Sequence, residues 1–295
     1  MAAPRQGSVR RIGILLVGLQ TANLPALRYL ILQLNRLQTT FEYEFLPTQD
    51  PERPDDEDVV EDEFFTMLRA DFEIEKDRVK NAVPAFVDRY LAFLLTLNSK
   101  YKLQEEPPDY FIVVSLARFD DGFYAARKAQ VSVLALGNWD PVMAPPSILE
   151  SILTFVVRES LASISPRLNR SIHLGTKGCV CDFTANLDEA RIKVLSSFVC
   201  EHCRTALREE GHGVLVQEVQ TVLSRDWLGT VDNPSCPAAI IAKLGYNLFA
   251  TKGFSATPWE KTLARASEEG IKQIVFLIAS VILAVVLVWL GLKPK

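Results

Sequence analysis

The chain has 295 residues, of which 48% are hydrophobic, so it suits one large globular domain or two small ones with a proper core. Its net charge is −4, and the sequence contains no cluster of lysines and arginines. Such a chain is poorly suited to contact a phosphate backbone, which excludes nucleic acid as an expected partner.

The first half of the chain alternates between strand and helix patterns. Residues 12–18 form an apolar run typical of a buried strand, residues 25–37 carry apolar side chains at helical spacing, and residues 42–46 alternate as a strand does. Further strands are expected at 110–117 and 131–136. This alternation predicts an α/β fold, with a mixed sheet of about four strands and flanking helices.

The segments between these elements have other signatures. Residues 50–63 hold nine acids and one arginine, which predicts an exposed acidic loop or a disordered insertion. A long helical region follows at 64–100, with a break expected near Pro84. Ser147, with a glutamate three residues later, has the pattern of a capping box and opens a further helix.

The region after this helix contains the clearest chemical signal. Residues 185–227 favour two helices and residues 237–250 another. Within and around them lie five cysteines, at positions 179, 181, 200, 203 and 236. In a reducing compartment, clustered cysteines indicate a metal site rather than disulfides, although five inert buried thiols are the simpler alternative.

The spacing of these cysteines suggests which of them bind metal. Zinc takes four soft ligands in a tetrahedron, and the Cys200-Glu-His-Cys203 turn can direct two thiolates at one ion. In an extended chain the side chains of Cys179 and Cys181 point to opposite sides, so that His173 becomes a rival for the fourth place. We predict a structural zinc, because an ion saturated by protein ligands has no open position for water or substrate.

Residues 173–207 resemble the C-terminal part of the archaemetzincins. Those proteins are zinc peptidases in which a catalytic HExxHxxGxxH site precedes a second, cysteine-bound zinc. The family pattern runs HCxxxxCxM, a spacer and CxxC; here Leu174 stands in place of the first cysteine and Cys181 in place of the methionine. The resemblance implies a metzincin-like sheet and a second zinc site. With Leu174 unable to bind metal, the predicted ligands are His173, Cys179, Cys200 and Cys203, with Cys181 as the alternative to His173.

This sequence departs from the family pattern in the residues that the family's reaction needs. Peptidase chemistry there needs two histidines one helical turn apart, with a glutamate beside the first as general base. This chain has three histidines and no HExxH. Residues 148–164 should carry the site, yet their acids, Glu150 and Glu159, are nine positions apart and lie on different helical faces.

Another catalytic pair is conceivable from the sequence. Cys236 precedes a proline at the expected start of a helix, where a thiol pKa can be depressed, and His212 could serve as its base. Nothing in the sequence brings the two residues together, so Cys236 is more simply a helix-entry or core residue. The sequence favours a protein that is not an enzyme.

The end of the chain is strongly apolar. Residues 274–292 form an uncharged run of 19 residues. At about 1.5 Å per residue this run would measure about 28 Å, close to a hydrocarbon core of about 30 Å. We therefore expect a transmembrane tail anchor at 271–292, and a main domain of residues 1–265 that faces the cytosol, because the N-terminal apolar run is too brief for a signal peptide.

Together these features predict a tail-anchored, catalytically inactive, peptidase-like protein. It would act as a membrane-tethered binding, sensing or scaffold module, with the lipid bilayer and a protein as its partners. One alternative is a hydrolase with an unrecognised active site in the peptidase-like cleft. Another is a membrane-disrupting effector whose single span oligomerises.

Overall fold

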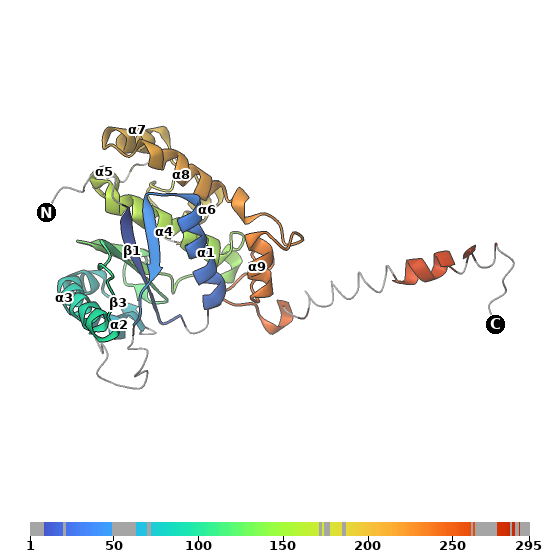
Figure 1. Ribbon diagram of the computed structural model, residues 1–295, viewed down its shortest axis with the longest axis horizontal. Helices are drawn as coiled ribbons and strands as arrows, with labels where there is room; N and C mark the ends of the chain where they lie inside the picture. The colour runs from blue at the N-terminus through green and yellow to red at the C-terminus, as the bar shows by residue number, and fades with distance from the viewer. Residues whose placement is uncertain are drawn as a thin grey trace. The chain divides into compact units, whose positions relative to one another are not determined.

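The computed structural model describes residues 9–19, 22–48, 63–69, 72–170, 173, 178–184, 187–260, 262, 276–283, 285–286 and 289 (Figure 1). The chain divides into two compact units, Met1–Ser255 and Ala256–Lys295. The acidic segment predicted at 50–63 lies outside the described residues, except for Glu63.

The first unit is a mixed α/β fold. Its strands are β1 (Arg10–Val17), β2 (Phe41–Phe45), β3 (Glu73–Ile74), β4 (Tyr110–Ser115), β5 (Arg118–Phe119), β6 (Ala125–Lys128) and β7 (Val131–Ala135). Its helices are α1 (Leu24–Leu37), α2 (Glu63–Arg69), α3 (Lys76–Tyr101), α4 (Ile148–Ile164), α5 (Pro166–Arg170), α6 (Leu187–Ser196), α7 (Glu201–Glu209), α8 (Gly213–Ser224) and α9 (Pro237–Lys243).

The main sheet corrects the predicted number of strands. In the described part of the chain it has five strands rather than about four, in the order β2-β1-β4-β7-β6, with only β6 antiparallel to its neighbour. The sequence Ala-Ala-Arg-Lys of β6 has little β-propensity and gave no strand signal. The strand forms because a two-residue turn at Ala129 and Gln130, with Ala129 at φ +50°, folds it back onto β7.

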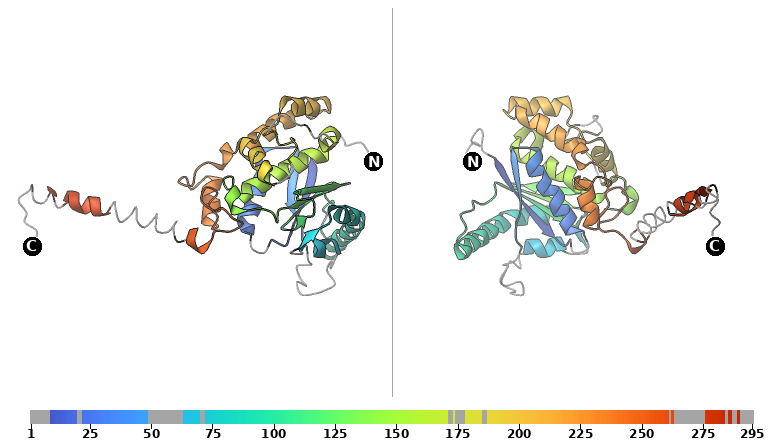
Figure 2. Two further views of the ribbon diagram at one scale, coloured as in Figure 1. Left: turned by 180° about the vertical axis from the view of Figure 1, so that it is seen from behind. Right: turned by 45° about the vertical axis from the view of Figure 1, so that its right-hand side comes forward.

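The sheet separates two hydrophobic layers (Figures 1 and 2). Successive residues of β4 alternate between them: Ile112 and Val114 pack with α1 and α4, whereas Phe111 and Val113 pack with α2 and α3. This alternation follows from the two-residue repeat of a strand that is buried on both faces. The three-layer arrangement places α4 in the interior, beneath the helices of the C-terminal half.

The predicted break of the long helical region is displaced. The helix α3 continues through Pro84, and the chain is interrupted earlier, between α2 and α3, where β3 pairs with β5. Apolar contacts outweigh the hydrogen bond that the proline removes, because Phe86 is fully buried and its ring stacks on Phe64 with centroids 4.3 Å apart.

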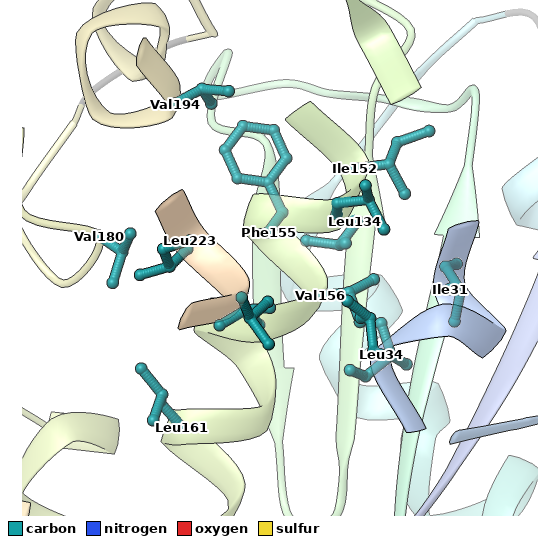
Figure 3. Packing of buried hydrophobic residues seen from close by; sticks show 14 of the residues in the cluster. Ile31, Leu34, Leu134, Ile152, Phe155, Val156, Leu161, Val180, Val194 and Leu223 are labelled. Carbon is teal, nitrogen blue, oxygen red and sulfur yellow. The ribbon is translucent and has the colours of Figure 1, made fainter. Parts of the chain in front are cut away.

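The central helix α4 begins as the sequence predicts. The Ser147 hydroxyl accepts from the Glu150 backbone N–H, and the Glu150 carboxylate accepts from the Ser147 backbone N–H, which confirms the capping box. Most of the helix is buried. Figure 3 shows that apolar side chains of α1, β7, α6 and α8, together with Val180, gather around it.

The C-terminal half of the first unit also differs from expectation. The described residues of 185–227 form three helices, α6, α7 and α8, instead of two. The additional break falls at Ser197, whose φ of +43° ends α6 just before Cys200 caps α7. This break matters for the site, because it allows the first turn of α7 to face the cysteines that precede α6.

The second unit corrects the prediction of a transmembrane helix at 271–292. Of that segment the structure describes 276–283, 285–286 and 289, and the helical stretch 276–283 is about 12 Å long at about 1.5 Å per residue. Among the described residues, no helix has the length and apolar character needed to cross a membrane. The prediction rested on the hydropathy of the run, which does not by itself set the length of a helix. The predicted single-pass tail anchor and its membrane localisation are therefore not supported.

Candidate metal centre

The metal-centre residues come from a tight turn and from the start of a helix. Gly178 adopts φ +96°, a conformation that favours glycine, and a Cβ there would meet Ser196 Oγ at 2.6 Å. The turn that follows is closed by the backbone N–H of Asp182, which donates to the carbonyl of Cys179 at 2.9 Å. Because the chain turns here, the side chains of Cys179 and Cys181 do not diverge as they would in an extended strand.

A second backbone contact brings this turn to α7. The N–H of Val180 donates to the carbonyl of Phe198 at 2.9 Å. The N–H of Cys200 donates to the sulfur of Cys179 at 3.4 Å, and the N–H of Cys181 donates to the same sulfur at 3.5 Å. Two N–H donors stabilise negative charge on the Cys179 sulfur, as a metal-bound thiolate requires.

Cys200 and Cys203 occupy the first turn of α7. Cys200 is the N-cap residue, and Cys203 lies three residues later on the same side of the helix. His173 reaches them from the strand-like pairing of its backbone with Asp182. Its Nε2 atom lies 3.2 Å from the Cys203 sulfur and 3.5 Å from the Cys200 sulfur.

The structure thus brings together the four residues predicted as ligands. Nε2 or Nδ1 of His173 and the sulfurs of Cys179, Cys200 and Cys203 offer ligand atoms that all lie within 4.8 Å of one another. Around a tetrahedral zinc with Zn–S bonds of about 2.3 Å, sulfurs would lie roughly 3.5–4 Å apart, so the arrangement fits an ion with small adjustments. The three sulfurs are buried, with Cys179 and Cys203 fully so.

The ring of His173 is oriented by a carboxylate on its other side. Its Nδ1 atom is buried and lies 3.3 Å from Oδ1 of Asp182, although the angle of this contact falls short of a hydrogen bond. The same oxygen accepts from the N–H of Phe183 at 3.1 Å. A metal-binding histidine commonly directs its second nitrogen at a carboxylate, which fixes its tautomer and raises its basicity.

A fourth sulfur, that of Cys181, lies beside this group. Hydrogen bonds with Cys179 and Cys203 hold the pKa of the buried Cys181 thiol well below its usual range, with smaller contributions from the cations Arg158 and Lys193. The same crowding of thiols, from Cys179 and then Cys181, raises the pKa of Cys203. Thiols this close can all be deprotonated only beside a cation, so the donor set fits a metal ion.

Lys193 is a buried residue of this region that the sequence gave no reason to single out. It is 3% exposed, and its ammonium donates to the carbonyl of Asp182 at 2.7 Å and to the hydroxyls of Thr184 and Tyr124 at 3.1 Å each. These three acceptors satisfy its three donors. Lys193 therefore ties the segment after the cysteine turn to α6 and to the sheet.

The acids of α4 are held in ion pairs. Glu150 accepts from Arg225 at 3.1 Å, and the fully buried Glu159 binds the guanidinium of Arg127 through both carboxylate oxygens. Burial alone raises the pKa of Glu159, but Arg127 beside it brings the pKa below its usual value. Both acids thus link α4 to neighbouring elements.

Cys236 and His212, the alternative catalytic pair, each stand at the start of a helix. Cys236 is the N-cap residue of α9, as the sequence suggested, and His212 is the N-cap residue of α8. Cys236 packs against Gly229, where a Cβ would meet its sulfur at 2.3 Å. No hydrogen bond joins Cys236 to His212 within the described residues.

No protein-family model and no curated protein matches the chain. The chain is similar to the crystal structure of archaemetzincin from Methanopyrus kandleri, with 12% sequence identity and a TM-score of 0.42, over 70% of this chain and 97% of that chain.

Proposed function

We propose that this chain is a zinc-stabilised binding protein without peptidase activity. The observation that carries the proposal is the convergence of three buried sulfurs and Nε2 of His173, with Asp182 behind the ring. One imidazole and three thiolates complete a tetrahedron, which leaves no coordination position for water or a substrate carbonyl.

Zinc in this position would act as a cross-link. Its bonds would join His173 and the turn at Cys179 to the first turn of α7, segments that the backbone already brings together. Structural zinc contributes on the order of 10–16 kcal/mol of apparent binding energy, as much as the whole stability of many domains, about 5–15 kcal/mol. The residues around it, Asp182 above all, orient the ligands and do not touch a substrate.

The central helix supports the same proposal. A peptidase would need a carboxylate free to accept a proton from a metal-bound water. Glu150 accepts a hydrogen bond in the cap of its own helix and pairs with Arg225. Glu159 is buried and forms an ion pair with Arg127. These contacts favour a structural role for both acids. The function would then be recognition, in which the chain senses a ligand or holds a protein partner.

Metal analysis and hydrolysis measured on the full-length protein test this proposal. We expect about one zinc per chain in the purified protein, and no peptide or ester hydrolysis above a metal-stripped control. Cys236→Ser serves as a matched variant, because Cys236 lies outside the metal group. Hydrolysis that rises with bound zinc and disappears in Cys203→Ser, but not in Cys236→Ser, would overturn the proposal and favour a hydrolase.

A further inference from the structure

A cavity of about 570 Å³ lies between α5 and α7, beside the metal centre. One wall consists of Pro166, Arg167 and Arg170 from α5, and the other includes His202, Thr205 and Glu209 from α7. The residues of α7 are spaced by three, four and seven positions, so that they share one face of the helix. Figure 1 shows α5 beside α7, in agreement with their direct contact.

The size of this cavity suits a small molecule. Sites for small ligands commonly measure about 300–1,000 Å³ and combine apolar walls with a few polar groups. Here Pro166 and Ala206 supply the apolar part, and the cavity borders the metal centre through His202. The ring of His202 stands edge-on to that of His173, with centroids 6.1 Å apart.

The two arginines that line the cavity differ in their partners. Arg167 forms an ion pair with Glu209, and its backbone N–H donates to Glu210 at 3.2 Å, so both acids already have a partner. Arg170 has no hydrogen bond or ion pair within the part of the chain that the structure describes. The guanidinium of Arg170 therefore lines the cavity without a partner there, together with the imidazole of His202 and the hydroxyl of Thr205.

We propose that this cavity binds a small molecule through a phosphate or carboxylate group held by Arg170. A guanidinium presents parallel N–H donors that match the oxygens of either group, and it remains charged at any physiological pH. The hydroxyl of Thr205 and the imidazole of His202 supply further hydrogen-bonding groups nearby. This inference rests on the proposed binding function and specifies the ligand class that the protein would sense.

Calorimetric titration of the full-length, metal-loaded protein tests the proposal. The probes are inorganic phosphate and succinate, each against sodium chloride of equal ionic strength. We expect saturable binding of at least one probe, weakened about tenfold or more in Arg170→Gln and less in Thr205→Val, because hydrogen bonds to charged groups are worth about 1.5–3 kcal/mol. Arg36→Gln, an exposed arginine of α1, is the matched control and should bind as the wild type does.

The outcomes separate this inference from the proposed function. Tighter binding of phosphate or of succinate identifies which of the two groups the cavity prefers. Metal-loaded protein that binds neither probe up to about 10 mM overturns the inference while leaving the zinc site intact. Equal affinities in the wild type, Arg170→Gln and Thr205→Val would also overturn it, because the anion would then bind elsewhere, for instance on the metal. Absence of metal from the purified wild type would contradict the proposed function instead.

Discussion

Asp182 lies behind the ring of His173, with its Oδ1 atom 3.3 Å from Nδ1, on the opposite side from the cysteine sulfurs that face Nε2. The pairing is set by the backbone, because the two residues form a parallel bridge and Phe183 N–H donates to the carbonyl of His173 at 3.1 Å. The carboxylate thus occupies the position from which it can hold the imidazole in one tautomer.

The first prediction concerns this carboxylate. Asp182→Asn should lower metal affinity by about 10–100-fold, because a neutral amide polarises the imidazole less than a carboxylate does. Competition with a chromophoric chelator at fixed pH measures the effect. Asp88→Asn, an exposed position of α3, is the matched control. Unchanged affinity in Asp182→Asn would mean that the contact between Asp182 and His173 plays no part in metal binding.

The second prediction concerns the dependence of the fold on the metal. Cys200→Ser and Cys203→Ser should lose zinc and the cooperative unfolding transition, since both residues tie α7 to the cysteine turn. The lost binding energy, on the order of 10–16 kcal/mol, is comparable to the whole stability of a domain. Cys236→Ser should keep zinc and melt within a few degrees of the wild type. Thermal unfolding with zinc measured per chain decides the matter, and a metal-free wild type with an unchanged melting temperature would contradict it.

The third prediction concerns alkaline stability. Burial raises the pKa of Tyr110 to about 12, with a further contribution from the charge of Glu159, whereas its ordinary value is about 10. Between about pH 10 and pH 12 the unfolded chain releases a proton that the folded chain retains. Stability that is fully present below pH 10 is therefore lost as the pH rises, by up to about 2.7 kcal/mol for this residue.

Tyr110→Phe isolates this contribution. At pH 8 the variant should be about 1 kcal/mol less stable than the wild type, because Tyr110 shares a hydrogen bond of 2.7 Å with Ser132. The difference should shrink above pH 10, change sign between about pH 10 and pH 11, and favour the variant at pH 12. Denaturant unfolding at each pH measures it, with Tyr29→Phe, a half-buried tyrosine of α1, as the control. A constant difference across this range would exclude the linkage.

The candidate metal ligands can be identified from the sequence because their spacing carries chemistry. A CxxC pair restricts two sulfurs to one helical turn, and the structure shows Cys200 and Cys203 on the first turn of α7. The side chains of Cys179 and Cys181 would diverge in an extended chain, whereas a turn at Val180 would fold them together, and the spacing alone does not decide between the two. Gly178, with φ +96°, begins a turn there, and a glycine just before the pair was the signal available for it.

Other features depend on contacts that a linear pattern does not contain. The sequence of β6 has no strand pattern of its own, and the strand forms because it pairs with β7. Lys193 is buried because three acceptors from other segments surround its ammonium. The apolar run at 274–292 misled the prediction of a span, since composition reports the hydropathy of a segment and not the length of its helix.

The last prediction concerns the fourth ligand, for which His173 and Cys181 are the candidates. The structure places Nε2 of His173 within 3.5 Å of two ligand sulfurs, and the group whose ligand atoms lie within 4.8 Å of one another contains His173 and not Cys181. Cys181 is nonetheless buried beside Cys179 and Cys203, so the choice depends on orientation rather than on distance alone. We expect His173→Ala to lose most of its zinc and Cys181→Ala to retain about one ion per chain.

Cobalt substitution adds a readout of the ligand set itself. Cobalt(II) in a tetrahedral site of three sulfurs and one nitrogen differs in its visible spectrum from cobalt(II) bound by four sulfurs, so Cys181→Ala should leave the spectrum of the wild type unchanged. We expect that Cys181 does not rescue His173→Ala, because its sulfur is not among the converging ligand atoms, and the zinc content of this variant measures this. Zinc retained in His173→Ala but lost from Cys181→Ala would assign the fourth place to Cys181, with the four cysteines as the ligand set.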